Sequence, residues 1–235
     1  MLMKNKTDIA LVSIIFLATL FGVYLNIEKQ RSIDKSKLPE RVEENKLFQR
    51  WITNLKNHDL NIEADEFKLK EENEIYNTTW MTVYSIDDPE QKALYEKTLE
   101  EHKNLDKVVF SPNERVFVDF RNIPRGNVMA NEVRVYGLKE DKIIDAKVLD
   151  CSTKGNCYFD RAYFLDNDVF VVSEFSRDID KKSPTVENCS VTQKCTYTIK
   201  LHVVDLVHNK RAIYVSEPFE AILSDLIKLL YEVEI

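Results

Sequence analysis

The residues with the clearest potential for chemistry are four cysteines in two pairs of equal spacing. Five residues separate Cys151 from Cys157, and five separate Cys189 from Cys195. This spacing exceeds the two to four residues typical of zinc knuckles, so metal binding is the weaker interpretation. Turn-forming residues lie between the cysteines, as in a stapled hairpin. We therefore predict two local disulfides, Cys151–Cys157 and Cys189–Cys195, which would indicate an oxidising compartment. The other connectivities and four free thiols stay open.

No other group of residues has the spacing of a catalytic or cofactor site. None of the four histidines stands with a second histidine, cysteine or acid at metal-ligand spacing on one expected element. No serine lies in a nucleophile elbow, and the 4 glycines are too scattered for a phosphate loop. Asp166-Asn167-Asp168 fits a hairpin turn better than a calcium loop. We predict no catalytic residue, no cofactor and no metal site, and hence a protein that is not an enzyme. The histidines are His58, His102, His202 and His208.

The composition indicates a folded chain that does not bind nucleic acid. Of the 235 residues, 44% are hydrophobic and 31% are charged, which suits a protein with a core. The formal net charge is −7 and is spread along the chain. An acidic balance without a basic stripe argues against a nucleic-acid partner.

The second half of the chain reads as a duplication. Val108–Val118 and Ala162–Val172 each have the pattern strand, turn, strand. Each is followed by a second matched pair of strands, in Val133–Ile144 and Leu201–Tyr214. We predict that residues 107–216 form two copies of one four-stranded antiparallel unit.

The two copies differ by one insertion. Phe110 aligns with Phe164 and Val133 aligns with Leu201, so copy two is longer between its second and third strands. The extra segment contains Cys189 and Cys195. We expect it to be a long hairpin whose tip is stapled by the second disulfide.

A short motif in copy one resembles a known repeat. Phe110-Ser111-Pro112-Asn113, followed by Val116-Phe117-Val118, resembles the β-propeller repeat of Tol-type periplasmic proteins. Glu114 stands where that family has glycine, and copy two has Leu165-Asp166 in place of Ser-Pro. The resemblance covers residues 107–216 at most. It implies blade-like sheets, but two blades cannot close a ring that needs about four.

The N-terminal segment is apolar enough to suggest a membrane helix. Ile9–Leu25 is interrupted only by Ser13, Thr19 and Gly22, and its exit lacks the small residues of a cleavage site. We predict a transmembrane signal anchor at residues 9–25 after a short cytoplasmic tail, residues 1–8. A cleaved signal peptide is the alternative. With the signal anchor, the protein would be a single-pass cell-membrane protein with an extracytoplasmic C-terminal domain.

The remaining segments complete an α+β assignment. Residues 26–39 read as a linker and residues 217–235 as a C-terminal amphipathic helix. Residues 40–106 read as helix, strand, strand, helix, with Asp88-Pro89 starting the second helix. The predicted fold is an N-terminal transmembrane helix plus a β-rich ectodomain of two blade-like antiparallel four-stranded units and flanking amphipathic helices.

These features favour a membrane-anchored, extracytoplasmic, non-enzymatic interaction or scaffold module of the cell envelope. Its expected partners are the membrane, through the N-terminal helix, and another envelope protein. A ligand-sensing ectodomain is an alternative that a deep apolar cavity between the sheets would favour. An enzyme is a further alternative, which two convergent carboxylates or a histidine beside a carboxylate would favour.

Overall fold

The computed structural model describes most of the chain as two units, residues 1–36 and residues 37–235. The described residues are Val12 and residues 14–25, 34–75, 80–125, 128–152, 154–180 and 188–226. For residues 123–125, 128–130, 179 and 180 the backbone alone is described. All elements named below, apart from one N-terminal helix, belong to the second unit.

The first unit contains a helix whose described part is shorter than a membrane span. Its described helical run covers residues 14–25, whereas a spanning helix needs about 20 residues. Nowhere in the described part of the chain is a helix both long and apolar enough to cross a bilayer. The predicted transmembrane helix and the predicted single-pass membrane location are therefore wrong. The other residues of the predicted anchor, 9–11 and 13, lie outside the described residues.

The second unit consists mainly of strands. Its helices are short, namely α2 (Glu40–Glu43), α3 (Lys46–Asn57), the 3-10 turn η1 (Ala64–Glu66), α4 (Pro89–His102) and α5 (Leu223–Leu226). Its strands are β1 (Lys68–Glu74), β2 (Met81–Ser85), β3 (Val108–Phe110), β4 (Val116–Asp119), β5 (Asn122–Arg125), β6 (Val128–Lys139), β7 (Lys142–Asp150), β8 (Lys154–Phe164), β9 (Val169–Asp180), β10 (Lys194–Asp205), β11 (Lys210–Val215) and β12 (Phe219–Ile222).

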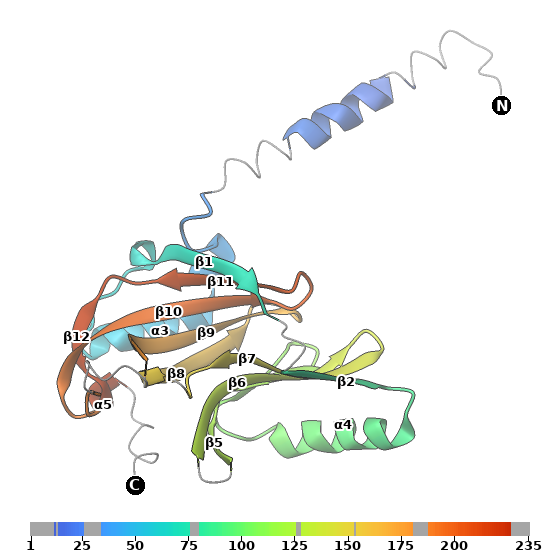
Figure 1. Ribbon diagram of the computed structural model, residues 1–235. Coiled ribbons are helices and arrows are strands. Elements are labelled where there is room, and N and C mark those ends of the chain that lie inside the picture. Colours follow the sequence, from blue (N-terminus) through green and yellow to red (C-terminus); the bar gives the residue numbers. More distant parts are fainter. Residues whose placement is uncertain are drawn as a thin grey trace, which may run out of the picture. The chain divides into compact units, whose positions relative to one another are not determined.

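The strands form two antiparallel sheets (Figure 1). Sheet 1 has the order β1-β11-β10-β9-β8, with β12 paired to β10, and sheet 2 has the order β2-β7-β6-β4-β3, with β5 paired to β6. Each sheet is built on a four-strand meander, and a strand from earlier in the chain lies beside the last strand of that meander. The predicted α+β fold with four-stranded units is thus corrected to a β-rich fold with two six-stranded sheets and few helices. The additional strands satisfy backbone groups that a four-stranded unit would leave unpaired at its edge.

The two meanders have corresponding rows of paired residues. In sheet 2 one row runs Phe110–Phe117–Tyr136, and in sheet 1 one row runs Phe164–Phe170–Val204. The first and last members of the two rows are aligned in the sequence, whereas the middle members differ by one position, because Phe117 aligns with Val171. The duplication itself and the resemblance to Tol-type repeats remain predictions.

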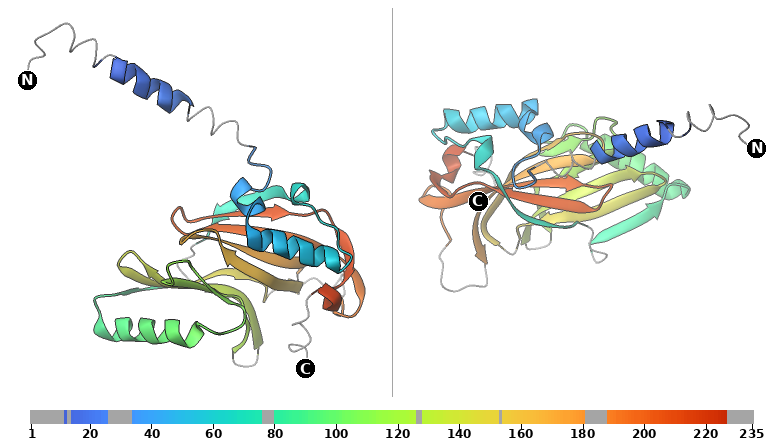
Figure 2. Two further views of the ribbon diagram at one scale, coloured as in Figure 1. Left: turned by 180° about the vertical axis from the view of Figure 1, so that it is seen from behind. Right: turned by 90° about the horizontal axis from the view of Figure 1, so that it is seen from above.

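The second unit is layered as α3, sheet 1, sheet 2 and α4 (Figures 1 and 2). One apolar cluster joins α2, α3 and α5 to one face of sheet 1, and a second cluster lies between the two sheets. The alternation of side chains along β9 explains this, because Val171 belongs to the first cluster and Phe170 and Val172 to the second. On the outer face of sheet 2, α4 contacts Phe117 and Tyr136 through His102 and Tyr95.

The helices follow local signals that are visible in the sequence. The predicted helix over Glu40–Lys56 is divided into α2 and α3, because the side chain of Asn45 accepts the Leu47 N–H and begins α3 there. Asp88 caps α4 by accepting the N–H groups of Glu90 and Gln91, and Pro89 is its first residue. Along α4 the one buried residue is Tyr95, so this helix is held by few contacts.

The predicted C-terminal amphipathic helix, residues 217–235, is wrong in its described part. Phe219–Ile222 forms β12, and α5 is a single turn after it. The reason lies in β10, because β11 pairs only with Lys200–Asp205 and leaves Lys194–Tyr197 open. β12 pairs with that open stretch and satisfies its backbone groups. Residues 227–235 lie outside the described residues.

Candidate functional site

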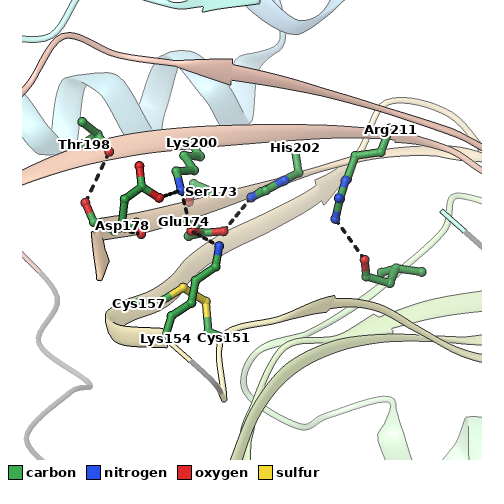
Figure 3. A network of polar contacts seen from close by, with 12 residues as sticks. Cys151, Lys154, Cys157, Ser173, Glu174, Asp178, Thr198, Lys200, His202 and Arg211 are labelled. Carbon is green, nitrogen blue, oxygen red and sulfur yellow. Dashed lines mark hydrogen bonds and ion pairs between the residues drawn. A yellow bond between two sulfur atoms is a disulfide. The ribbon is translucent and has the colours of Figure 1, made fainter. Parts of the chain in front are cut away.

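A group of charged side chains lies on the face of sheet 1 that is turned toward sheet 2 (Figure 3). Glu174 comes from β9, and Lys200 and His202 come from β10, where the register places Glu174 opposite Lys200. All three residues are buried, with exposed fractions of 3%, 6% and 4%. Burying charged groups costs free energy unless they are paired, so their contacts decide what the group does.

Glu174 is the centre of the group. One of its oxygens, Oε2, lies 2.8 Å from His202 Nε2. The other, Oε1, lies 3.4 Å from Lys200 Nζ and 3.8 Å from Lys154 Nζ. Lys200 also donates to Asp178, at the end of the group nearest the solvent. The group therefore contains two carboxylates, those of Glu174 and Asp178, and two ammonium groups, those of Lys154 and Lys200. The imidazole of His202 completes it.

The surroundings set the charge state of this group. Burial alone would raise the pKa of Glu174, but the hydrogen bond and charge of His202 and the charges of Lys200 and Lys154 outweigh it, so the pKa falls to about 2. Burial lowers the pKa of His202, and Glu174 offsets this only in part. At neutral pH Glu174 is thus a carboxylate, and neutral His202 donates its Nε2 proton to it. His202 Nδ1 has no described hydrogen-bond partner.

A histidine beside a carboxylate is a feature that would favour an enzyme. Whether His202 could act in catalysis depends on the groups that surround it. A cavity of about 270 Å³ adjoins the group, lined by residues of both sheets. Within the described residues no hydroxyl or thiol contacts His202, so it has no nucleophile to activate. Cys151, Cys157 and Glu174 lie close enough to share a metal, but both sulfurs belong to a disulfide and are not thiolates. The described contacts of Glu174 are thus ion pairs with two lysines and one hydrogen bond with His202.

Both disulfides are present. Cys151 is bonded to Cys157 and Cys189 to Cys195, which confirms that the cysteines form disulfide bonds. The first joins the end of β7 to β8, and its cysteines belong to the apolar cluster between the sheets. The second joins the segment before β10 to that strand. Residues 181–187 are outside the described part, so the predicted long hairpin is described only at its base.

One amide side chain connects the two disulfide-closed loops. Asn156 lies inside the first loop and is 7% exposed. Its Oδ1 accepts the Cys189 N–H at 2.7 Å, and its Nδ2 donates to the Cys189 carbonyl at 2.6 Å. The backbone N–H and carbonyl of Cys189 are therefore both hydrogen-bonded to Asn156. In a sheet, a neighbouring strand would supply these two bonds.

The free edge of sheet 2 is a different kind of site. β2 is the end strand, and no other described strand pairs with its outer side. The N–H of Lys147 bonds to the Trp80 carbonyl, and the N–H of Ile86 bonds to the Asp141 carbonyl. Because inward and outward residues alternate in an antiparallel strand, Met81, Val83 and Ser85 direct their backbone groups outward.

The side chains of this edge are uncharged, and several of them are exposed. Met81-Thr82-Val83-Tyr84-Ser85 contains no charged residue. Trp80, Val83 and Tyr84 are 47%, 46% and 37% exposed. An uncharged strand with outward backbone groups is a template for the addition of another strand.

No family model, curated protein or solved structure matches this chain. The function must therefore be argued from its own residues. Sequence reasoning missed Glu174, Lys200 and His202, because they come together only through the pairing of β9 with β10. The absence of charge in β2 was visible in the sequence, but its place at a sheet edge was not.

Proposed function

We propose that this chain is a non-enzymatic interaction protein that binds an extended segment of another polypeptide by adding it as a strand beside β2. The observation that supports this most directly is the uncharged, outward-facing edge of β2. In strand addition, backbone hydrogen bonds supply affinity and alternate side chains supply specificity. In the buried Glu174 network, by contrast, no hydroxyl or thiol of the described residues is hydrogen-bonded to His202.

The backbone of β2 can accept such a segment without losing its own pairing. Its inward groups bond to β7, whereas those of Met81, Val83 and Ser85 are directed away from the sheet. Val83 is the middle residue of the strand, so an added segment would pair with it first. The side chains of Trp80 and Tyr84 provide aromatic surface of the kind that is enriched in protein interfaces.

The partner segment should be uncharged at its centre. β2 has no charged side chain that could pair with a charge of the partner, and burying an unpaired charge there would cost free energy. Residues with high strand propensity, such as valine, isoleucine, threonine and tyrosine, suit an extended segment. The chain's two disulfides require that binding be measured with oxidised protein.

The test uses a displayed library of random 12-residue peptides, panned against the full oxidised chain. Enriched peptides are expected to bind wild-type protein and to lose at least tenfold in affinity for Val83→Pro. Proline removes the outward N–H of residue 83 and no hydrogen bond to β7. Val83→Ala is the matched control, since it shortens the same side chain and keeps the N–H, and it should bind within about threefold of wild type.

Two outcomes would overturn the proposal. One is a library that yields no peptide, or peptides that bind Val83→Pro as tightly as wild type. The other is a concentration-dependent dimer in sedimentation velocity that Val83→Pro abolishes, because the edge would then serve a second copy of this chain. Melting curves of both variants must first match wild type, since β2–β7 pairing is left intact.

A further inference from the structure

A second cavity, separate from β2, lies where α3 passes the edge strand β8. Its volume is about 720 Å³, within the roughly 300–1,000 Å³ of small-molecule sites. α3 contributes Leu47 and Trp51, and the residue after it contributes His58, while other lining residues come from β8 and from the segment that enters β3. The cavity therefore combines residues that are far apart in the chain.

The wall formed by β8 is irregular at one residue. The pairing of β8 with β9 shifts between Phe159 and Arg161, so Asp160 is the extra residue of a bulge. Bulges redirect a side chain from the regular alternation of a strand. Here Asp160 accepts the indole N–H of Trp51 at 2.8 Å. Burial raises the pKa of Asp160, although Trp51, Arg161 and Lys107 act in the opposite direction.

Two polar groups of the cavity lack partners within the described residues. The hydroxyl of Tyr163 is buried, in a residue that is 3% exposed, and it makes no hydrogen bond there. Lys107 is half-buried and forms no direct ion pair with a described carboxylate; burial lowers its pKa, and the nearby charge of Asp160 offsets this only in part. An unpaired hydroxyl and an unpaired ammonium group both cost free energy, which a ligand that bonds to them would recover.

The other charged groups at the cavity favour the same kind of ligand. Arg50 and Arg161 also line it, and neither is ion-paired with a described acid. The two acids that face it are Asp106, which is exposed, and Asp160, which Trp51 already occupies. The lining thus carries three cationic side chains against two acids, and Asp160 acts on two of the three, Lys107 and Arg161.

Much of the remaining wall is apolar, although Asn54 and His58 also line it. Leu47, Val109, Phe120 and Leu226 line the cavity beside these polar groups. A ligand that fills the volume must therefore carry an apolar body as well as an acidic group.

From these contacts we infer that the cavity binds a small amphiphilic carboxylate, with its carboxylate at Lys107 and the Tyr163 hydroxyl and its apolar body against Val109, Phe120 and Leu226. The phenol donates one hydrogen bond to the carboxylate and the ammonium group donates another. Such charge-assisted bonds are stronger than neutral ones. This site and its ligand are independent of the strand addition proposed for β2.

Calorimetric titration of the full oxidised chain tests this with three probes of equal chain length, namely decanoate, decanol and decyltrimethylammonium. Decanoate is expected to bind at least tenfold more tightly than decanol, and decyltrimethylammonium more weakly than both. Lys107→Gln should weaken decanoate about tenfold and leave decanol unchanged. Tyr163→Phe should weaken decanoate about fivefold without lowering the melting temperature, because the hydroxyl that it removes is buried and unpaired.

Two controls separate this site from the rest of the molecule. Lys97→Gln removes a charge from the exposed side of α4, and Val83→Pro alters β2, so both should retain the wild-type affinity for decanoate. The inference is overturned if no probe binds, or if decyltrimethylammonium binds more tightly than decanoate. It is equally overturned if decanoate binds Lys107→Gln and Tyr163→Phe as tightly as it binds the two controls.

Discussion

Sheet 1 is covered on one face by α3 and on the other by sheet 2, whereas among the described elements it is α4 that covers the outer face of sheet 2 (Figures 1 and 2). One ion pair of each sheet can be compared. The side chains of Glu174 and Lys200 on sheet 1 are 3% and 8% exposed. Those of Arg134 and Asp145 on sheet 2 are 24% and 33% exposed, although Asp119 and Glu132 of that sheet are buried.

Their free edges differ in the opposite sense. β1, at the edge of sheet 1, has the sequence KLKEENE, in which charged residues predominate. β2, at the edge of sheet 2, has the sequence MTVYS and no charge. Charged edge strands are a usual protection against unwanted pairing. One meander plan therefore carries a charged edge strand in one sheet and an uncharged edge strand in the other.

The largest expected difference between the sheets concerns their ion pairs. Glu174→Gln leaves Lys200 buried beside a neutral amide and should lower the free energy of unfolding by about 3–5 kcal/mol. Asp145→Asn on sheet 2 should cost about 1 kcal/mol or less, because its pair is partly exposed. Urea denaturation of the oxidised chain measures both. Equal losses would show that burial does not distinguish the two sheets.

A second effect is a loss of stability in acid that originates in sheet 1. Glu174 has a folded pKa of about 2 against an ordinary value of 4.5, so its contribution is present above pH 4.5 and is lost as the pH falls toward 2. His202 has a lowered pKa, so below about pH 6.5 the unfolded chain gains a proton that the folded chain does not. Both groups make the free energy of unfolding fall with falling pH.

Urea midpoints at pH 7, 5.5 and 4 check this expectation. The Glu174 contribution corresponds to about 3 kcal/mol across its range. His202→Gln should reduce the decline between pH 6.5 and 5. A midpoint that rises on acidification would contradict the assignment of these charge states.

The smallest effect on stability is expected at the edge of sheet 1. Glu72→Val should change the free energy of unfolding by no more than about 0.5 kcal/mol, since the residue is exposed. It removes a charge that protects β1, so it should increase self-association in sedimentation velocity. If self-association did not change, the charges of β1 would not be what keeps that edge unpaired.

Part of the fold could be predicted from local sequence signals. The cysteine spacing indicated the two disulfides, and Asp88-Pro89 indicated the start of α4. The final helix was wrong because the spacing of Phe219, Ile222 and Leu223 fits one face of a helix, while the short apolar run also fits a strand. The open stretch of β10 decides between them, and it is distant in the sequence.

The sites were beyond prediction for the same reason. Glu174 and His202 meet only when β9 pairs with β10, and the cavity at Trp51 requires α3 to lie across β8. Neither pairing leaves a local signature. The network also contains no motif, because its members come from several strands at irregular intervals.

The connection of β1 to β11 has a consequence for the order of folding. β1 pairs with β11 from Lys68↔Val215 to Glu74↔Lys210, so the whole of sheet 2 is contained in the chain between them. During synthesis β11 emerges after β1. By that time all strands of sheet 2 have emerged and can fold through local hairpins. Closing so long a loop is entropically costly and slow. We therefore expect pulse-labelled hydrogen exchange to show the amides of β1 protected after those of β6 and β7; protection of β1 first would exclude this order.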